Sequence, residues 1–173
     1  CRAFGMEIMA FDPYVSKEKA DRAGVQLVDD LKGGMALADV ITLHVPLTRE
    51  SRGMLDAATL RACKRGAYLV NCARGGLVDE EACAEAVRSG ILAGTAFDVF
   101  DGEPVRGDHP LLASDIRGKV ILTPHIGANT EEAQSAVAVI AASNLAAALL
   151  GKPYEHAVNL PFSEQLLSDG SRA

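Results

Sequence analysis

Two side chains with clear chemical potential follow short apolar runs in this sequence. Arg74 comes three residues after the apolar run Ala67–Asn71 and stands before two glycines that allow a sharp turn. A guanidinium at the mouth of a cleft can hold a carboxylate through two parallel hydrogen bonds. His125 follows the run Lys119–Leu122, and an imidazole can take up and release a proton near neutral pH. These residues predict anion binding and proton transfer.

Three further segments carry polar side chains at the ends of apolar runs. Asp12 ends one run and can accept hydrogen bonds from the ribose hydroxyls of a dinucleotide, and its charge would favour NAD over NADP. The loop 44–48 must leave its strand at Pro46 and could flank an adenine ring. The acidic segment 98–104 could supply a carboxylate that orients an imidazole.

Each of these features also has a purely structural explanation. Asp12 begins an Asp-Pro turn, the loop 44–48 suits an ordinary connection, and Arg74 suits an exposed βα loop. The acidic segment could simply be solvated, and a single loop histidine can be inert. All five segments nevertheless follow strands, and ligands of open parallel sheets bind beyond the carboxyl ends of the strands. Their shared placement favours one functional site.

Short apolar runs alternate with helical segments along the chain. This alternation predicts an α/β fold of the Rossmann type, a doubly wound parallel sheet, and the nearly continuous apolar runs predict strands covered on both faces. The predicted strands are Glu7–Phe11, Val25–Val28, Val40–Val45, Ala67–Asn71, Leu92–Phe97 and Lys119–Leu122. The predicted helices are Ser16–Ala23, Asp29–Leu37, Asp56–Ala62, Asp79–Ser89 and Thr130–Leu150, the last of them buried or half-buried.

Composition excludes several other classes of protein. The net charge of −6 argues against binding to a nucleic-acid backbone. No apolar run approaches the ~20 residues of a membrane span. The four cysteines form no CxxC pair and the four histidines lack zinc-ligand spacing, so we expect reduced cysteines, a cytoplasmic protein and no metal site.

Three motifs resemble those of D-2-hydroxyacid dehydrogenases, and of phosphoglycerate dehydrogenases in particular. They are the segments Asn71–Glu80, Phe97–Pro104 and Thr123–Ala128, and Val158–Pro161 resembles the segment that leaves the nucleotide domain of the phosphoglycerate enzymes. The resemblance implies an NAD-dependent enzyme that transfers a hydride between nicotinamide and a D-2-hydroxy acid. It points to the conversion of 3-phosphoglycerate to 3-phosphooxypyruvate in serine biosynthesis.

The resemblance also implies a role for each site residue. Arg74 would bind the substrate carboxylate, His125 would act as general acid in reduction and as base in oxidation, and Glu103 would fix the tautomer of His125. Asp98 would hold the nicotinamide carboxamide. The other residues that match cofactor contacts are Asp12, Val45 and Cys72, together with the backbone of His125, Ile126, Gly127 and Ala128.

The chain departs from the family at its beginning. A glycine-rich phosphate-binding turn should precede Asp12 by some twenty residues, but only eleven residues precede it and no GxGxxG occurs. We therefore expect a fragment, with a partial NAD-binding domain at 1–150 and a segment at 151–173 that returns toward a substrate domain. Because a helix N-terminus supplies the main pyrophosphate site, we expect the isolated chain to be inactive.

Other functions within the same fold stay open at this point. Glyoxylate, hydroxypyruvate and D-lactate reductases share Arg74, Glu103 and His125, and so do corepressors that sense NAD without catalysis. Formate-type dehydrogenases carry an amide where Glu103 stands, which argues against them. The expected partners are a small 2-hydroxy or 2-oxo acid and a second copy of the full-length protein, with no nucleic acid and no membrane.

Overall fold

The computed structural model describes residues 1–153 of the chain. Most of the predicted return segment, including Val158–Pro161, lies outside the described residues. The chain divides into two compact units, the first formed by Cys1–His125 and the second beginning at Ile126. The predicted domain boundary at residue 150 stays a prediction.

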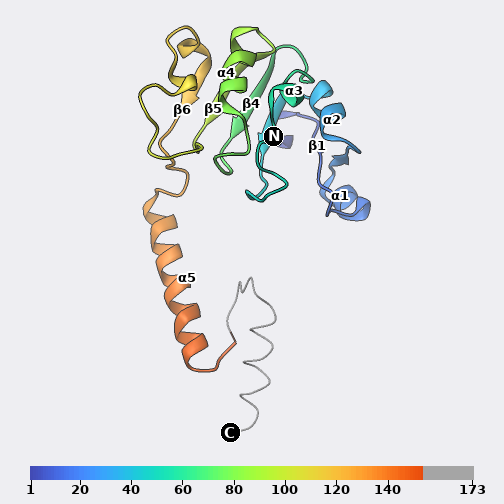
Figure 1. Ribbon diagram of the computed structural model, residues 1–173. Coiled ribbons are helices and arrows are strands. Elements are labelled where there is room, and N and C mark those ends of the chain that lie inside the picture. Colours follow the sequence, from blue (N-terminus) through green and yellow to red (C-terminus); the bar gives the residue numbers. More distant parts are fainter. Residues whose placement is uncertain (154–173) are drawn as a thin grey trace. The chain divides into compact units, whose positions relative to one another are not determined.

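Six parallel strands form the first unit, and all six were predicted. β1 (Met9–Ala10) pairs with β2 (Gln26–Leu27) in a two-stranded sheet. A second sheet has the order β3-β4-β5-β6 (Figure 1). Its strands are β3 (Val40–Leu43), β4 (Ala67–Asn71), β5 (Leu92–Phe97) and β6 (Val120–Leu122). Parallel pairing confirms the predicted α/β class, because parallel neighbours require crossover connections.

The predicted α-helices form close to their expected boundaries. They are α1 (Lys17–Ala23), α2 (Leu31–Leu37), α3 (Ala57–Leu60), α4 (Glu80–Arg88) and α5 (Glu131–Leu149). Each follows a capping residue whose side-chain oxygen accepts a hydrogen bond from a backbone N–H of the first turn, as Asp79 does for α4. The three 3₁₀ segments, η1 (Arg2–Phe4), η2 (Pro110–Leu112) and η3 (Arg117–Lys119), were not predicted.

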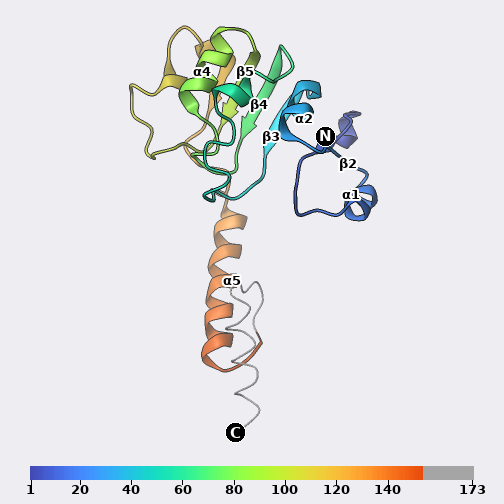
Figure 2. The ribbon, with the colours of Figure 1, turned by 45° about the vertical axis from the view of Figure 1, so that its right-hand side comes forward.

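The core lies between the four-stranded sheet and the helices α3 and α4 (Figure 2). Leu69 and Phe97 of the sheet belong to the same buried cluster as Leu60 of α3 and Val87 of α4. The opposite face of the sheet is open, with Val40, Tyr68 and Ile121 about half exposed or more. The expectation of strands covered on both faces is therefore wrong within the first unit, where no helix of that unit packs against this face.

The second unit contains α5, which was predicted to be buried or half-buried but is not buried within this unit. No residue of α5 is buried within the described part of the chain. Its exposed apolar residues, among them Val137, Val139 and Ile140, point to several sides of the helix and so form no single stripe. The expectation that no segment approaches a membrane span is wrong as well, since α5 satisfies that criterion by length and composition alone.

Candidate active site

The carboxyl ends of β4, β5 and β6 lie side by side at one edge of the sheet. Asn71, the last residue of β4, is in register with Phe97, the last residue of β5, which is in register with Leu122 of β6. The ladder continues one step further, since the Asp98 N–H donates to the carbonyl of Asn71 and the Thr123 N–H to that of Phe97. The loops that carry Arg74, Glu103 and His125 therefore start from neighbouring points on this edge.

Glu103 and His125 form a hydrogen-bonded pair at this edge. Nδ1 of His125 lies 2.7 Å from Oε2 of Glu103, while Oε1 of Glu103 accepts a hydrogen bond of 3.0 Å from the Phe100 N–H. The bond from His125, and secondly that from Phe100, holds the pKa of the Glu103 carboxyl below its ordinary value. Because an ionised carboxylate only accepts, Nδ1 of His125 carries a proton and Nε2 is left for chemistry.

The backbone at His125 adopts a conformation that side chains other than glycine rarely take. Its φ is +53°, in the left-handed region, and its N–H donates to the carbonyl of Thr123 at 3.0 Å. A non-glycine residue in this region costs on the order of 1 kcal/mol, and such positions concentrate at functional sites. The strain falls on the residue that the sequence marked for proton transfer.

Arg74 stands on a loop that the side chain of Asn71 fixes from inside. The buried Asn71 amide accepts from the Ala73 N–H at 3.1 Å and donates to the Arg74 carbonyl at 3.0 Å. The Arg74 side chain is exposed, and its Nη1 donates to the Ala73 carbonyl at 2.6 Å. The Arg74 guanidinium forms no ion pair within the described residues and is exposed, so its remaining N–H groups can bind a ligand.

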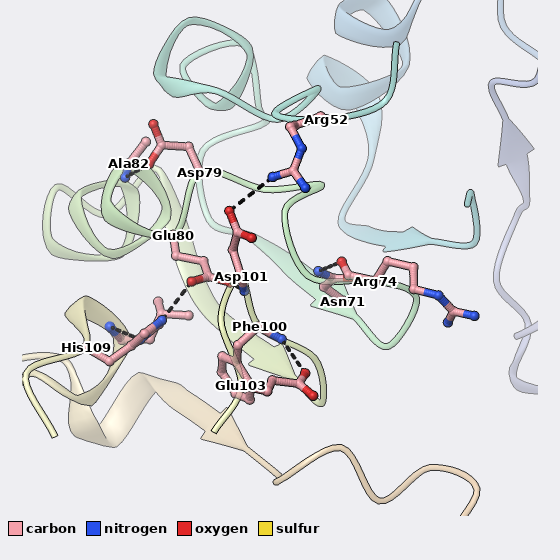
Figure 3. A network of polar contacts seen from close by, with 11 residues as sticks. Arg52, Asn71, Arg74, Asp79, Glu80, Ala82, Phe100, Asp101, Glu103 and His109 are labelled. Carbon is pink, nitrogen blue, oxygen red and sulfur yellow. Dashed lines mark hydrogen bonds and ion pairs between the residues drawn. The ribbon is translucent and has the colours of Figure 1, made fainter. Parts of the chain in front are cut away.

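A backbone contact holds the Arg74 loop against the Glu103 loop. A Cβ atom added at Gly75 would lie 1.9 Å from the carbonyl oxygen of Phe100 and 2.8 Å from the backbone nitrogen of Asp101. Only glycine permits this approach, which brings the two loops together in Figure 3. The close contact fixes the position of one predicted site residue relative to another.

The four side chains predicted to bind the cofactor within the first unit all follow strand ends. Asp98 is buried after β5 and accepts a short hydrogen bond from the Thr123 hydroxyl after β6. Cys72 is exposed after β4, and Val45 is partly buried after β3. Asp12 follows β1 and is exposed. Its side chain accepts a hydrogen bond of 2.9 Å from the Tyr14 N–H, which forms the Asp-Pro turn given above as the structural explanation of this residue.

Apart from His125, the remaining predicted cofactor residues belong to the second unit. Ile126 accepts a hydrogen bond from the Asn129 N–H, and Ala128 accepts one from the side chain of Gln134 on α5. Gly127 lies between them in the turn before Thr130, the N-cap of α5.

His44, in the loop predicted to flank an adenine ring, is exposed and shares a 3.0 Å hydrogen bond with Thr42.

Sequence reasoning missed the residues that hold this site in place. Asn71 and Thr123 lie in the motifs named above, but no role was predicted for either. Each is a polar residue at or just after the end of an apolar strand, and this position was a signal that the sequence contained. The pair formed by Glu80 and His109 was missed altogether, because the two residues lie 29 positions apart. No local pattern reveals such a contact.

The reactivity of the cysteines gives a direct test of which cysteine side chains are buried. Burial raises the pKa of the Cys83 thiol to about 12, and it also raises that of Cys63. At pH about 8 roughly one Cys83 thiol in ten thousand is ionised, and only the thiolate reacts with iodoacetamide. We expect iodoacetamide to label Cys72 and to spare Cys83, as measured by peptide mass spectrometry of the native protein.

The same reaction in denaturant provides the control for this prediction. Unfolded protein should be labelled at both positions, because burial no longer protects either thiol. Equal labelling of Cys72 and Cys83 under native conditions would contradict the described packing of α4 against β5.

Comparison with known proteins agrees with this geometry. Residues 1–127 match the family described as D-isomer specific 2-hydroxyacid dehydrogenase, NAD binding domain. D-3-phosphoglycerate dehydrogenase of Methanocaldococcus jannaschii is 48% identical over 160 residues, a match that covers 92% of this chain and 30% of the relative. The chain thus spans less than a third of the length of that enzyme.

Solved structures show the same fold. A protein of Thermus thermophilus aligns with a TM-score of 0.79 at 38% identity, covering 91% of this chain and 47% of the other. A D-isomer specific 2-hydroxyacid dehydrogenase of Xanthobacter autotrophicus, solved with NADPH and MES, aligns with a TM-score of 0.72 at 30% identity, covering 92% and 63%. The chain belongs to the D-isomer-specific 2-hydroxyacid dehydrogenase family, whose NAD-binding domain it matches.

Proposed function

We propose that the complete protein oxidises a D-2-hydroxy acid with NAD, and that its substrate is D-3-phosphoglycerate, in the direction that leads to serine. The observation that carries the proposal is the 2.7 Å contact between Glu103 and His125 at the sheet edge that also carries Arg74. The choice of substrate is supported by 48% identity to a D-3-phosphoglycerate dehydrogenase.

His125 handles the proton of the reaction. In oxidation its Nε2 accepts the proton of the substrate hydroxyl, and in reduction it returns a proton to the carbonyl oxygen. Glu103 accepts a hydrogen bond from the Nδ1–H throughout, so the ring keeps its orientation and the positive charge that it gains is stabilised. NAD, when bound, would supply the hydride acceptor for oxidation.

Arg74 binds the substrate carboxylate. Its exposed guanidinium offers several N–H donors in a planar fork, which matches the two oxygens of a carboxylate. Asn71 and the close approach at Gly75 keep its backbone fixed, so the charge is positioned before the substrate arrives. This arrangement fixes the hydroxyl-bearing carbon relative to His125.

The donor set at the strand ends suits NAD. Asp12 presents an exposed carboxylate that can accept from the adenosine ribose hydroxyls and that repels a 2′-phosphate. Asp98 is held by Thr123 and can hold the nicotinamide carboxamide. Val45 and Cys72 are small side chains that could pack against the cofactor. The backbone groups of His125, Ile126, Gly127 and Ala128 are further proposed cofactor contacts. The Xanthobacter relative was solved with NADPH, whereas the carboxylate of Asp12 supports a preference of this protein for NAD.

A panel of substrates tests the proposal. The complete gene product should reduce NAD with D-3-phosphoglycerate at a higher kcat/KM than with D-lactate, D-glycerate or glycolate. A higher kcat/KM with one of the last three would move the assignment to another substrate of the same family. Binding of NAD with no hydride transfer to any 2-hydroxy acid would favour the corepressor alternative.

Replacement of Arg74 should mainly weaken substrate binding. A hydrogen bond to a charged group contributes about 1.5–3 kcal/mol, so we expect Arg74→Ala to lower kcat/KM for the hydroxy acid by about 10- to 150-fold. Arg74→Lys should recover part of this loss, because an ammonium keeps the charge but lacks the fork. Steady-state kinetics with varied substrate measures both. An unchanged KM in Arg74→Ala would contradict the role of Arg74.

We also propose where the protein is located, its oligomeric state and which partners it lacks. We propose a cytoplasmic protein that binds neither nucleic acid nor membrane, supported by the net charge of −6 and by the free cysteines. We also propose that the complete protein is a homodimer, which is supported only by its resemblance to the family. Light scattering of the complete gene product measures its mass. Sedimentation with phospholipid vesicles tests whether the apolar helix α5 brings the protein to a membrane.

A further inference from the structure

A second histidine–carboxylate pair lies behind the proposed active site, on the side of α4. Nε2 of His109 is 2.7 Å from Oε2 of Glu80, the first residue of α4. Their side chains are only 10% and 9% exposed, whereas those of His125 and Glu103 are 52% and 35% exposed. The buried pair is therefore shielded from substrate, and nothing in the proposed chemistry uses it.

The protonation of this pair follows from its other contacts. Nδ1 of His109 accepts a hydrogen bond of 3.3 Å from the Leu111 N–H, so Nε2 carries the proton and donates it to Glu80. The His109 ring also meets the Phe100 ring edge-on, with 5.5 Å between the centroids. His109 thus joins the start of η2 to the helix α4 and to the loop after β5.

The other oxygen of Glu80 reaches the segment that carries Glu103. Oε1 of Glu80 accepts a hydrogen bond of 2.9 Å from the N–H of Asp101, two residues before Glu103 (Figure 3). The adjacent N–H, that of Phe100, donates to Glu103 itself. The N–H groups of Phe100 and Asp101, which are adjacent in one loop, therefore each donate to a carboxylate. The Phe100 N–H donates to Glu103 in the proposed active site, and the Asp101 N–H donates to the largely buried Glu80.

The remaining contact to this loop is weaker. Arg52 Nη1 lies 3.3 Å from Asp101 Oδ2, but both side chains are more than half exposed, and exposed ion pairs contribute little. Glu80 is thus the most buried polar group that fixes residues 100 and 101. Without it, the buried Phe100 ring and the backbone contact with Gly75 would still hold residue 100, but the N–H of Asp101 would lose its hydrogen bond.

We propose that Glu80 and His109 are positioning residues for the Glu103–His125 pair. This inference rests on the proposed function and goes beyond it, since neither residue touches substrate or cofactor. A displacement of about 1 Å at reacting groups can cost on the order of 100-fold in rate. Loss of the Asp101 anchor lets Glu103 move, and His125 then loses the orientation of its ring.

Kinetics of the complete gene product test the inference. We expect Glu80→Ala and His109→Leu each to lower kcat by on the order of 10-fold or more, with KM for NAD and for the hydroxy acid within about twofold of wild type. His109→Gln should restore most of the rate, because its amide can still donate to Glu80. Glu81→Ala is the matched control, since Glu81 is an exposed first-turn carboxylate of the same helix. It should retain the wild-type kcat.

Each outcome separates one claim from another. A wild-type protein without hydride transfer overturns the proposed function, and this inference with it. An active wild type in which Glu80→Ala behaves like Glu81→Ala overturns the inference alone. Parallel changes in kcat and KM, or equal losses in His109→Leu and His109→Gln, would show a general loss of structure and would also overturn it. If Glu80→Ala does not fold, the two His109 variants decide the question.

Discussion

His125→Asn should lower kcat by about 100- to 10,000-fold, which is the range that a positioned acid–base group contributes. The asparagine amide can still donate to Glu103 in place of Nδ1, but it has no counterpart of Nε2. Asparagine also tolerates the φ of +53° at this position better than most residues. The variant therefore removes the proton-transfer group while it retains the hydrogen bond and the backbone conformation.

Two controls make this prediction specific. Asp21→Asn changes an exposed residue of α1 that has no role in the proposed site, and it should retain kcat within about twofold. Binding of NADH to His125→Asn, measured by fluorescence, should stay close to wild type. Because one group carries the proton in both directions, oxidation and reduction should fall by similar factors. A kcat within threefold of wild type would remove His125 from the mechanism.

Gly75→Ala should disrupt the protein more than any other exchange of glycine for alanine at an ordinary φ. The new Cβ would lie 1.9 Å from the Phe100 carbonyl oxygen, and backbone atoms cannot give way as a flexible side chain can. Overpacking of this kind costs about 3 kcal/mol or more. We expect Tm of the complete gene product to fall by about 5 °C or more, as measured by thermal unfolding.

The activity of Gly75→Ala should fall with its stability, because the substitution separates the loop of Arg74 from the loop of Glu103. Gly118→Ala is the matched control, since Gly118 has an ordinary φ and no atom within 4 Å of its added Cβ. That exchange should leave Tm unchanged or raise it slightly, because alanine reduces the entropy of the unfolded chain. Equal Tm values for the two variants would contradict the close approach of the loops.

The sequence predicted the elements well because their signals are local. Each predicted helix begins after a residue whose short polar side chain caps the first turn, such as Ser16, Asp56 or Thr130. The strands were visible as apolar runs, and β4 and β5 have the predicted bounds. Helix capping and strand propensity depend on a few neighbouring residues, so one sequence is enough to predict them.

Burial was predicted less well because it depends on distant parts of the chain. Val40 and Ile121 lie in apolar runs, yet their side of the sheet is open in the described residues. For the same reason the sequence indicated a buried α5, although none of its residues is buried there. Whether an apolar run is covered depends on which elements pack against it, and this information is not contained in the run itself.

The candidate site shows the same difference between local features, which were predicted, and long-range contacts, which were not. Arg74, Glu103 and His125 stand in short motifs and were predicted by position, and the 2.7 Å contact between the last two agrees with the expected pairing. The contacts that fix them join residues far apart in the chain, as between Gly75 and Phe100 or between Glu80 and His109. Their geometry requires coordinates, because close approaches between loops leave no periodic pattern.

We expect Arg74, Glu103 and His125 to support the oxidation by NAD of only one enantiomer of a 2-hydroxy acid. The most direct test of this selectivity is the formation of NADH by the complete gene product with the D and L enantiomers of 3-phosphoglycerate, measured by absorbance. The account predicts that NADH forms with the D enantiomer, that the L enantiomer gives none, and that His125→Asn suppresses the reaction. NADH formation from the L enantiomer, or an undiminished rate in His125→Asn, would contradict it.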